Sequence, residues 1–531
     1  MHRYIRPEIL SNPHLFPHSS RKQVVSDSRF STQTPPASQG PRFPIEFWAL
    51  LALTAAVRLP GITRPLLGNF ATKNVMYAMI ARNWVEGRAG ILYPTLDCLV
   101  GGKRSLHMLE FSVSAYLTGG LWKLFGGSLD VWGRATSVGF SVGSVALVFL
   151  LVRRWHGRTA ALGAGFVLAL SPVSVIYGQS FMLDASIVFF SIASFHAVDR
   201  WLEGGRSAWL LVACLSLALL LLTKVYLVVL LLPLGVMVAF GDRLAGRPSP
   251  EGRARRSRCA LAALAAALAV LPVALWCVHA IRTAAPGSPH APHVYSCLQG
   301  NAEAYRPPDP LLRTPDFYRR LLDDLTGVIL TPLGFVLLLI GFTDRAWRRH
   351  AAWLVAMVIL MAALPRKFYD MNYYCMAVLP PLCVVAGLGW QVVWERLRPG
   401  RAATAGLLLV ALVLSMRYAV KPAFVTPQED RAVVAAGRAV QGLTPEEEPV
   451  VTMHGTTIDL VYYCNRPGWA VPPDTPDLDA VLEECRRQGA RHLVVTGSDD
   501  RGVSEPRIEA YAPVVRGNGF CVYRLIGPDD P

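Results

Sequence analysis

Charged side chains are scarce in this chain of 531 residues. Only 17% of the residues are Asp, Glu, Lys or Arg, whereas 53% are hydrophobic, and the mean hydropathy is +0.36. Soluble globular domains are about 25% charged. This deficit excludes an ordinary soluble enzyme and an intrinsically disordered protein.

Cysteine is also sparse, with 10 residues in the whole chain, which excludes a disulfide-rich secreted scaffold. Cys98 and Cys297 fall in segments that we expect outside the cytoplasm, and the sequence leaves their pairing open. The sequence has no P-loop motif, no internal repeat and no His/Cys/Asp grouping with metal-ligand spacing. A metal site made by the protein is therefore not expected, although a divalent cation that joins the reaction stays open.

The excess of positive charge requires an explanation, because 52 Lys and Arg face 37 Asp and Glu. A nucleic-acid-binding protein has such an excess. Here, however, the arginines collect in short loops between long apolar runs, which is typical of the cytoplasmic loops of membrane proteins. We therefore expect contact with membrane lipids and none with nucleic acid.

Residues 1–43 are polar and lack the apolar core of a signal peptide, so we predict a disordered cytoplasmic tail. A transmembrane domain is predicted over 44–425, because a helix needs about 20 apolar residues to span a bilayer. About 11 spans are expected. The apolar segments run at roughly 47–59, 136–152, 158–176, 183–199, 207–223, 225–241, 259–281, 326–342, 350–365, 376–394 and 402–420.

The arginine clusters test this arrangement. With the N-terminus in the cytoplasm, the clusters at 153–158, 200–206, 242–258, 345–349 and 396–401 all fall on the cytoplasmic side. We therefore predict a multi-pass protein of the cytoplasmic (inner) membrane. Three segments are then extracytoplasmic: the long first loop at 60–133, a loop at about 283–325 and a C-terminal domain at 426–531.

The extracytoplasmic segments show two different patterns. In the first loop, 72–84 and 110–125 each carry an apolar stripe and predict two helices that lie in the membrane interface. His107, between them, is expected in solvent. The C-terminal domain alternates helical patterns at 430–441 and 477–488 with β-rich runs at 449–453, 492–496 and 520–525. It predicts a small α/β domain. The fold class is thus a polytopic all-α membrane protein with a small C-terminal extracytoplasmic α/β domain.

Ionisable groups at the outer membrane face are the candidate functional residues, because burying a charge in a bilayer costs several kcal/mol. A carboxylate there can act as general base on an acceptor hydroxyl, and Lys or Arg can bind a phosphate leaving group. A lone acid at a helix end often only caps the helix, and Lys224 could merely extend its ammonium group into the interface. The candidates are Asp97, Glu110, Asp184, Lys224, Arg366 and Lys367, with Tyr373 and Tyr374 as substrate-binding side chains.

The order of these features resembles a known family. The first features are one span, the long first loop, a span that ends at 151–158 and a turn that ends in Asp184. The loop contains the short motif at 79–83, and further short motifs follow at 222–224, 372–374, 379–381 and 386–389. They resemble the polytopic C-type-fold glycosyltransferases that use lipid-phosphate sugars. Within this class, the chain most resembles bacterial proteins related to protein O-mannosyltransferases and the aminoarabinose transferases that modify lipid A.

This resemblance implies an inverting transfer of a sugar from polyprenyl phosphate to a hydroxyl acceptor outside the membrane. The family's usual acidic pair is replaced here by Lys73 and Asn74. We therefore expect Asp97 or Glu110 to supply the base and Asp184 to match the second acid. Lys73, Arg82 and Lys224 would hold the donor phosphate, and Asn74 would contact substrate.

Other functions stay open at this point. Because the acidic pair is missing, the chain could bind polyprenyl-linked sugars in cell-envelope assembly without catalysis. A transporter or flippase is disfavoured, since no two related halves are visible. An O-antigen ligase or polymerase would carry its large outer loop late in the chain. The sequence names neither the sugar nor the acceptor, which could be a protein, a lipid or a glycan.

Overall fold

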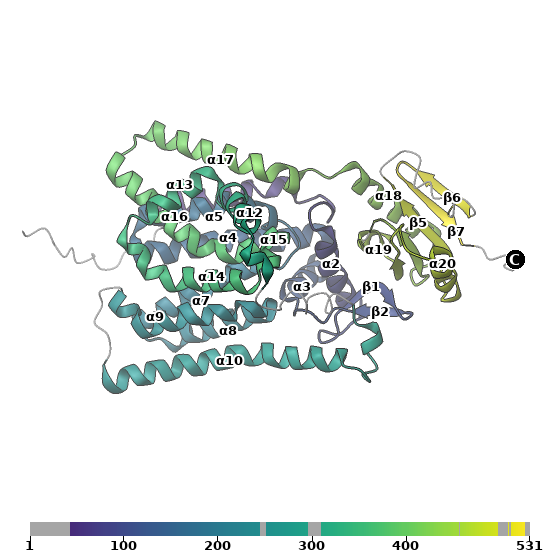
Figure 1. Cartoon of the computed structure of the whole chain (residues 1–531), viewed down its shortest axis with the longest axis horizontal. Coiled ribbons are helices and arrows are strands. Elements are labelled where there is room, and N and C mark those ends of the chain that lie inside the picture. Colours follow the sequence, from purple (N-terminus) through teal and green to yellow (C-terminus); the bar gives the residue numbers. More distant parts are fainter. Residues whose placement is uncertain are drawn as a thin grey trace, which may run out of the picture. The chain divides into compact units, whose positions relative to one another are not determined.

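The computed structural model describes residues 43–244, 251–295, 309–455, 457–497, 508 and 511–525. The predicted tail at 1–43 lies outside these ranges except for its last residue, and Cys297 lies outside them as well. The arrangement of the helices and strands is drawn in Figure 1.

Each predicted apolar segment is helical over most of its length. Helix α5 (Arg158–Leu170) is followed by the short α6 (Pro172–Tyr177), because Pro172 cannot continue the hydrogen-bond ladder of α5. The other helices of the bundle are α1 (Ile45–Ala56), α4 (Leu129–His156), α7 (Asp184–Gly204), α8 (Ser207–Thr223), α9 (Leu231–Leu244), α10 (Gly252–Ala284), α12 (Pro315–Asp324), α13 (Thr331–Gly341), α14 (Ala351–Ala363), α15 (Pro365–Asp370), α16 (Cys375–Leu397) and α17 (Arg401–Phe424).

The number of membrane crossings stays a prediction. Among the described residues, five helices are long and apolar enough to cross a membrane, or six if a pair bent by 105° between Pro315–Ile329 and Thr331–Gly341 counts as one span. Several other predicted spans are shorter helices, such as Ser207–Thr223. The chain is a multi-pass membrane protein.

Glycines let the central helices pack at backbone distance. A Cβ atom at Gly389 of α16 would lie 1.9 Å from the carbonyl oxygen of Leu337 in α13, and one at Gly341 of α13 would lie 2.0 Å from that of Val385. Small residues at helix contacts are typical of membrane proteins, where van der Waals packing holds helices together. The contact between α13 and α16 therefore depends on the absence of these side chains.

A buried arginine closes the helix ends near the first loop. Arg58 follows α1 and is fully buried, and its guanidinium donates to the carbonyls of Thr54 and Ala169 and to the hydroxyl of Ser174. The carbonyls belong to the last turns of α1 and α5, where helix dipoles are negative. The cation thus satisfies carbonyl groups that a helix end leaves unpaired.

The C-terminal part contains the predicted sheet, and the sheet also includes a hairpin from the first loop. The predicted runs are β3 (Val450–Met453), β5 (His492–Thr496) and β7 (Phe520–Arg524); β1 (Thr95–Val100), β2 (Lys103–Leu106), β4 (Gly468–Ala470) and β6 (Ala512–Gly517) were not expected. The strand order is β2-β1-β4-β3-β5-β7-β6. Cys98 of β1 lies opposite Gly468 of β4, in parallel register. Residues 370 positions apart in the chain therefore share one sheet.

Helices cover both faces of this sheet. Side chains alternate along each strand, so each face carries apolar residues that pack against a helix. Val450 and Val494 face α18 (Gln428–Leu443) and α19 (Asp459–Cys464). Val451 and Leu493 face α20 (Leu478–Arg487). The prediction of an α/β arrangement in the tail is confirmed.

The two helices predicted in the first loop are α2 (Ala71–Val85) and α3 (Val113–Phe125). Helix α2 differs from the expectation of a half-exposed surface helix, since nearly all of it is buried, including the polar residues Asn74 and Asn83. Its sides pack against α3, β1 and α19, so the C-terminal part covers a face that the sequence pattern assigns to water.

The close packing of α16 gives a stability prediction. We expect Gly389→Ala to lower the thermal unfolding midpoint of the purified protein in detergent, with a cost of roughly 1–3 kcal/mol for the overpacked contact. Gly406→Ala, in α17 with no neighbour within 4 Å, is the matched control and should leave the midpoint unchanged or raise it. An equal midpoint for the two variants would contradict this packing.

Candidate active site

Helix α2 begins with a strained residue that fixes its position. Phe70 has a positive φ of 53°, which is uncommon for a residue other than glycine. Its ring packs edge-on against Tyr373, with the ring centroids 5.0 Å apart, and the amide of the preceding Asn69 donates to the Tyr177 hydroxyl at 3.0 Å. Because residues four apart share a helix face, the helix then presents Lys73 and Tyr77 on one side.

Glu110 lies at the centre of the site, just before α3. Its carboxylate is buried, accepts a hydrogen bond from the Tyr77 hydroxyl and lies 3.3 Å from Nζ of Lys224. Lys224 follows the last residue of α8, so three separate elements meet at this carboxylate. The sequence predicts both Glu110 and Lys224 as functional residues, and the structure brings them together.

A cavity of about 320 Å³ opens beside this pair. One side of it is polar and includes ammonium groups and tyrosine hydroxyls, and the other side is apolar and belongs to α8 and α10. Five of the lining residues were candidates from the sequence besides Glu110. The lining includes Lys73, Glu110, Leu221, Leu222, Lys224, Tyr226, Val273, Trp276, Cys277, Lys367, Tyr373 and Tyr374.

Glu110 is ionised in this setting. Its burial opposes the charge, but Lys224 and Lys73 outweigh the burial and hold the pKa of Glu110 well below its usual value. The neighbouring His107 is also buried, which contradicts its expected place in solvent, because the first loop folds back onto α2. Burial lowers the pKa of His107, so its imidazole is neutral at pH 7. The net charge of the polar side is therefore set by the lysines and Glu110.

Asp184 is the first residue of α7 and is buried, with one carboxylate oxygen that accepts no hydrogen bond from the described residues. It lies within electrostatic range of Lys224, Glu110 and Lys73 but does not line the cavity. A buried carboxylate oxygen without a donor is rare in proteins. Asp184 thus adds a second buried carboxyl group near the lysines.

Asp97 and Arg82 lie away from the cavity, in a buried ion pair with a distance of 2.7 Å between Oδ2 and Nη2. Burial alone would raise the pKa of Asp97, but Arg82 and Arg104 outweigh it and lower that pKa. Asp97 is therefore fully engaged with two guanidinium groups. This geometry offers no support for Asp97 as the base or Arg82 as a phosphate ligand.

The remaining candidates separate in the same way. Lys367 of α15 lines the cavity, whereas its neighbour Arg366 points away, is largely exposed and pairs with Asp309 at 2.7 Å. Asn74 is buried and donates to the Phe70 carbonyl within the first turn of α2. The sequence analysis missed Tyr226 and Trp276, which lie at the ends of apolar segments. Tyr226 follows the candidate Lys224 by two residues, and this closeness to a candidate in the chain could have identified it.

A divalent cation fits this lining poorly. The cavity has three ammonium groups beside one carboxylate, and no group of three His, Cys, Asp or Glu side chains suited to a metal occurs among the described residues. Ammonium groups repel a metal ion and attract an anion such as a phosphate.

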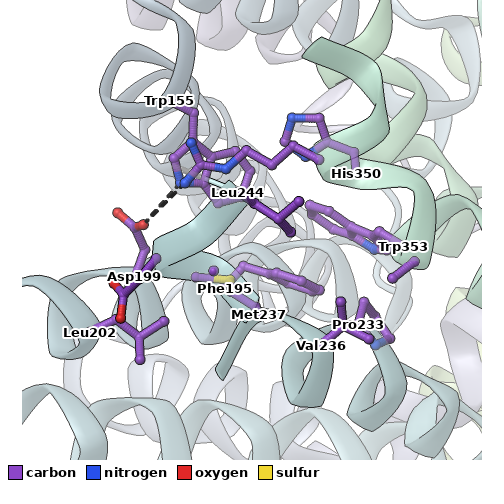
Figure 2. A pocket seen from close by; sticks show the side chains of 14 residues that line it. Trp155, Phe195, Asp199, Leu202, Pro233, Val236, Met237, Leu244, His350 and Trp353 are labelled. Atoms are coloured by element: carbon purple, nitrogen blue, oxygen red, sulfur yellow. Dashed lines mark hydrogen bonds and ion pairs between the residues drawn. The ribbon is translucent and has the colours of Figure 1, made fainter. Parts of the chain in front are cut away.

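A second polar cluster lies near the C-terminal end of α7, beside the pocket drawn in Figure 2. Asp199 is fifteen residues beyond Asp184 on α7, roughly 22 Å along the helix. Its carboxylate pairs with Arg154 at 2.7 Å and accepts a hydrogen bond from the Trp155 indole at 3.0 Å. Next to it, Nε2 of His156 lies 2.7 Å from Nε2 of His350. These contacts join the ends of α4, α7 and the segment before α14, and we assign them to packing.

Comparison with known proteins supports the fold. The profile of the family Dolichyl-phosphate-mannose-protein mannosyltransferase matches residues 112–276, which include Asp184 and Lys224. The protein YkcB of Bacillus subtilis (strain 168), which carries a mannosyltransferase name, is 34% identical over 92 residues. That stretch covers 17% of this chain and 13% of YkcB.

Solved structures match much more of the chain. ArnT of Cupriavidus metallidurans bound to undecaprenyl phosphate has a TM-score of 0.63 and 14% identity, with 91% of this chain and 98% of ArnT covered. The oligosaccharyltransferase of Archaeoglobus fulgidus has a TM-score of 0.52 and 13% identity, with 85% and 69% covered. The chain therefore has the glycosyltransferase C-type fold, as its resemblance to this class predicted.

The contact between Glu110 and Lys224 gives a prediction that needs no substrate. Lys224→Met leaves Glu110 buried without its nearest cation, so we expect a loss of stability of up to about 3 kcal/mol. Adding Glu110→Gln should recover part of this loss in a double-mutant cycle of thermal unfolding midpoints. Lys103→Met, at an exposed position of β2, is the control. Additive effects of the two substitutions would show that the two groups do not interact.

Proposed function

We propose that the chain is a membrane glycosyltransferase that moves a sugar from a polyprenyl-phosphate donor to a hydroxyl acceptor, with inversion, on the extracytoplasmic face. The observation that carries this proposal is one cavity with three ammonium groups and a buried, ionised carboxylate, within a C-type fold. The arginine clusters, such as Arg153 to Arg158 at the far end of α4, favour the cytoplasmic side for the opposite end.

The two sides of the cavity suit the two parts of such a donor. Lys73, Lys224 and Lys367 can hold the phosphate, which carries the charge of the leaving group. The apolar side consists of residues of α8 and α10, of which α10 is long and apolar enough to span a bilayer, where an isoprenoid tail is soluble. ArnT was solved with undecaprenyl phosphate, and the archaeal AglB of Archaeoglobus fulgidus with a dolichol-phosphate. Tyr373 and Tyr374 line the same cavity and would contact the sugar or the acceptor.

Glu110 is the proposed general base. The acceptor oxygen attacks the anomeric carbon of the sugar, the bond from that carbon to the phosphate oxygen breaks, and its electron pair stays on the phosphate. The hydroxyl proton moves to Glu110, and the lysines stabilise the charge on the leaving phosphate. Tyr77 holds the carboxylate in place through its hydrogen bond. Asp184 is a second acid within electrostatic range of Lys224 and Lys73.

The low pKa of Glu110 beside the lysines makes it a weak base, and donor binding should change this. The donor phosphate and Glu110 compete for the same ammonium groups, Lys224 and Lys73. Once these cations are shared with phosphate, they stabilise the ionised carboxylate less, and its pKa rises toward the working range. The base is then strong only while the donor is bound.

Binding without turnover is the second candidate function. It is favoured by Lys73 and Asn74 at the position where the resembled family has an acidic pair. A chain of this kind would bind polyprenyl phosphate through the same lysines and release no product. Purified protein incubated with polyprenyl-phosphate mannose and a mixture of envelope acceptors separates the two, because only an enzyme releases polyprenyl phosphate.

Substitution of the proposed base gives the main activity prediction. We expect Glu110→Gln to lower the rate of polyprenyl phosphate release by roughly 100- to 10,000-fold, the range for loss of a general base. Glu86→Gln, in the same loop but outside the cavity, is the matched control and should keep wild-type activity. Retained activity in Glu110→Gln would remove Glu110 from the mechanism, and no release from the wild type with retained lipid binding would favour the second function.

The pH dependence gives another prediction. Since the pKa of Glu110 lies well below its usual value, kcat/KM should show no acidic decline above about pH 5. In kcat, which reports the donor-bound state, the decline should lie at higher pH. Lys73→Gln removes a cation, so the pKa of Glu110 rises and activity is lost at a pH about one unit higher. Lys103→Gln should leave both profiles unchanged, and identical profiles for Lys73→Gln would contradict the charge competition.

A further inference from the structure

We infer that α19 of the C-terminal part is a positioning element for the active site: it holds α2 so that Lys73 and Tyr77 face Glu110. The inference rests on the proposed function for its activity readout. Its structural content rests on the contacts of Arg82, Asp130, Tyr462 and Tyr463.

Two adjacent tyrosines of α19 bind one carboxylate. The Tyr462 hydroxyl donates to Oδ1 of Asp130 at 2.6 Å, and the Tyr463 hydroxyl donates to Oδ2 at 2.9 Å. Asp130 is the second residue of α4, and the Tyr463 hydroxyl also accepts from the backbone N–H of Leu66 at 2.6 Å. This small helix is thereby attached to the bundle and to the chain that leads into α2.

The same helix is attached to α2. Nη1 of Arg82 donates to the carbonyl oxygen of Tyr462 at 3.2 Å, and its guanidinium lies 4.6 Å from the centroid of the Tyr462 ring. Arg82 in turn pairs with Asp97 of β1. At the start of α2, the Thr72 hydroxyl donates to Asp459, the first residue of α19, at 3.4 Å. Both ends of α2 thus contact α19.

These contacts lie on the side of α2 away from the cavity. Val461 and Tyr462 of α19 share a buried apolar cluster with Val75 and Met79 of α2. At about 100° per residue, these two positions lie on the opposite side of the helix from Lys73, which lines the cavity, and from Tyr77, which binds Glu110. Helix α2 is therefore held between the C-terminal part and the active site. Any shift of α2 moves an ammonium group and a hydroxyl away from the base.

This arrangement gives new roles to residues that the sequence presented as catalytic candidates. Asp97 and Arg82 touch neither the cavity nor the proposed base, yet they complete the contact between α19, α2 and β1. They act through the position of α2. Tyr462, Tyr463 and Asp130 join them as positioning residues, and none of these three was a candidate from the sequence.

The test is the double substitution Tyr462→Phe with Tyr463→Phe in the full chain, which keeps both rings and removes the two hydrogen bonds to Asp130 and the one that Tyr463 accepts from Leu66. We expect hydrogen–deuterium exchange of α2 to become at least about fivefold faster, with exchange in α16 unchanged. We also expect kcat/KM to fall by about tenfold and its acidic decline to move up by about half a pH unit or more, because Lys73 and Tyr77 stabilise the Glu110 anion less well. A role limited to stability would reduce the amount of folded protein without moving the pH profile.

The controls distinguish the alternatives. Tyr511→Phe removes a hydroxyl from the opposite face of the sheet and should change neither readout. Asp130→Asn keeps one acceptor oxygen and should recover part of what Asp130→Ala loses. Unchanged exchange in α2 for the double variant would overturn the inference whatever the activity. If the wild type shows no transfer while exchange in α2 responds as expected, the proposed function fails and the positioning contact stands.

Discussion

The attraction between a buried carboxylate and the ammonium groups around it is the interaction on which this site depends. Glu110 could not remain ionised under this degree of burial without Lys224 and Lys73. The lysines in turn could not line a half-apolar cavity without a counter-charge. Each charge offsets the cost of burying the other. A phosphate that enters the cavity would weaken the attraction between Glu110 and the lysines, because it attracts the same ammonium groups. The chemistry proposed for the site follows from this mutual compensation of the charges of Glu110 and the lysines.

The cavity is assembled from elements far apart in the chain. The first loop supplies Lys73 and Glu110, the end of α8 supplies Lys224, and α15 supplies Lys367. Such an assembly needs a rigid frame, since an error of about 1 Å at a reacting group can cost 100-fold in rate. The glycine contacts of α13 and α16 provide this frame within the bundle. The mixed sheet and α19 provide it for the first loop.

The sequence predicted the bundle well, because long apolar runs leave few alternatives to helices. It also predicted β3, β5 and β7, because each of them is a short, continuous run of mostly apolar residues. It missed the hairpin of β1 and β2, although Gly101 and Gly102, both with positive φ, form a recognisable two-residue turn. The candidate list contained the three lysines and Glu110. It could not separate them from Asp97 and Arg82, because an ion pair formed across fifteen residues looks the same in a sequence as two independent functional groups.

The pairing of β1 with β4 has a consequence for synthesis of the chain. Val100 emerges from the ribosome long before Gly468, and at roughly 5–20 residues per second the interval is tens of seconds. During that time the early hairpin has no parallel neighbour and α2 has no α19 to cover it. A partly made chain can therefore insert its helices into the bilayer before the site around Glu110 has formed. The proposed active site would therefore form only when the polypeptide is complete, and a truncated copy without α19 and β4 would insert into the membrane without a formed site.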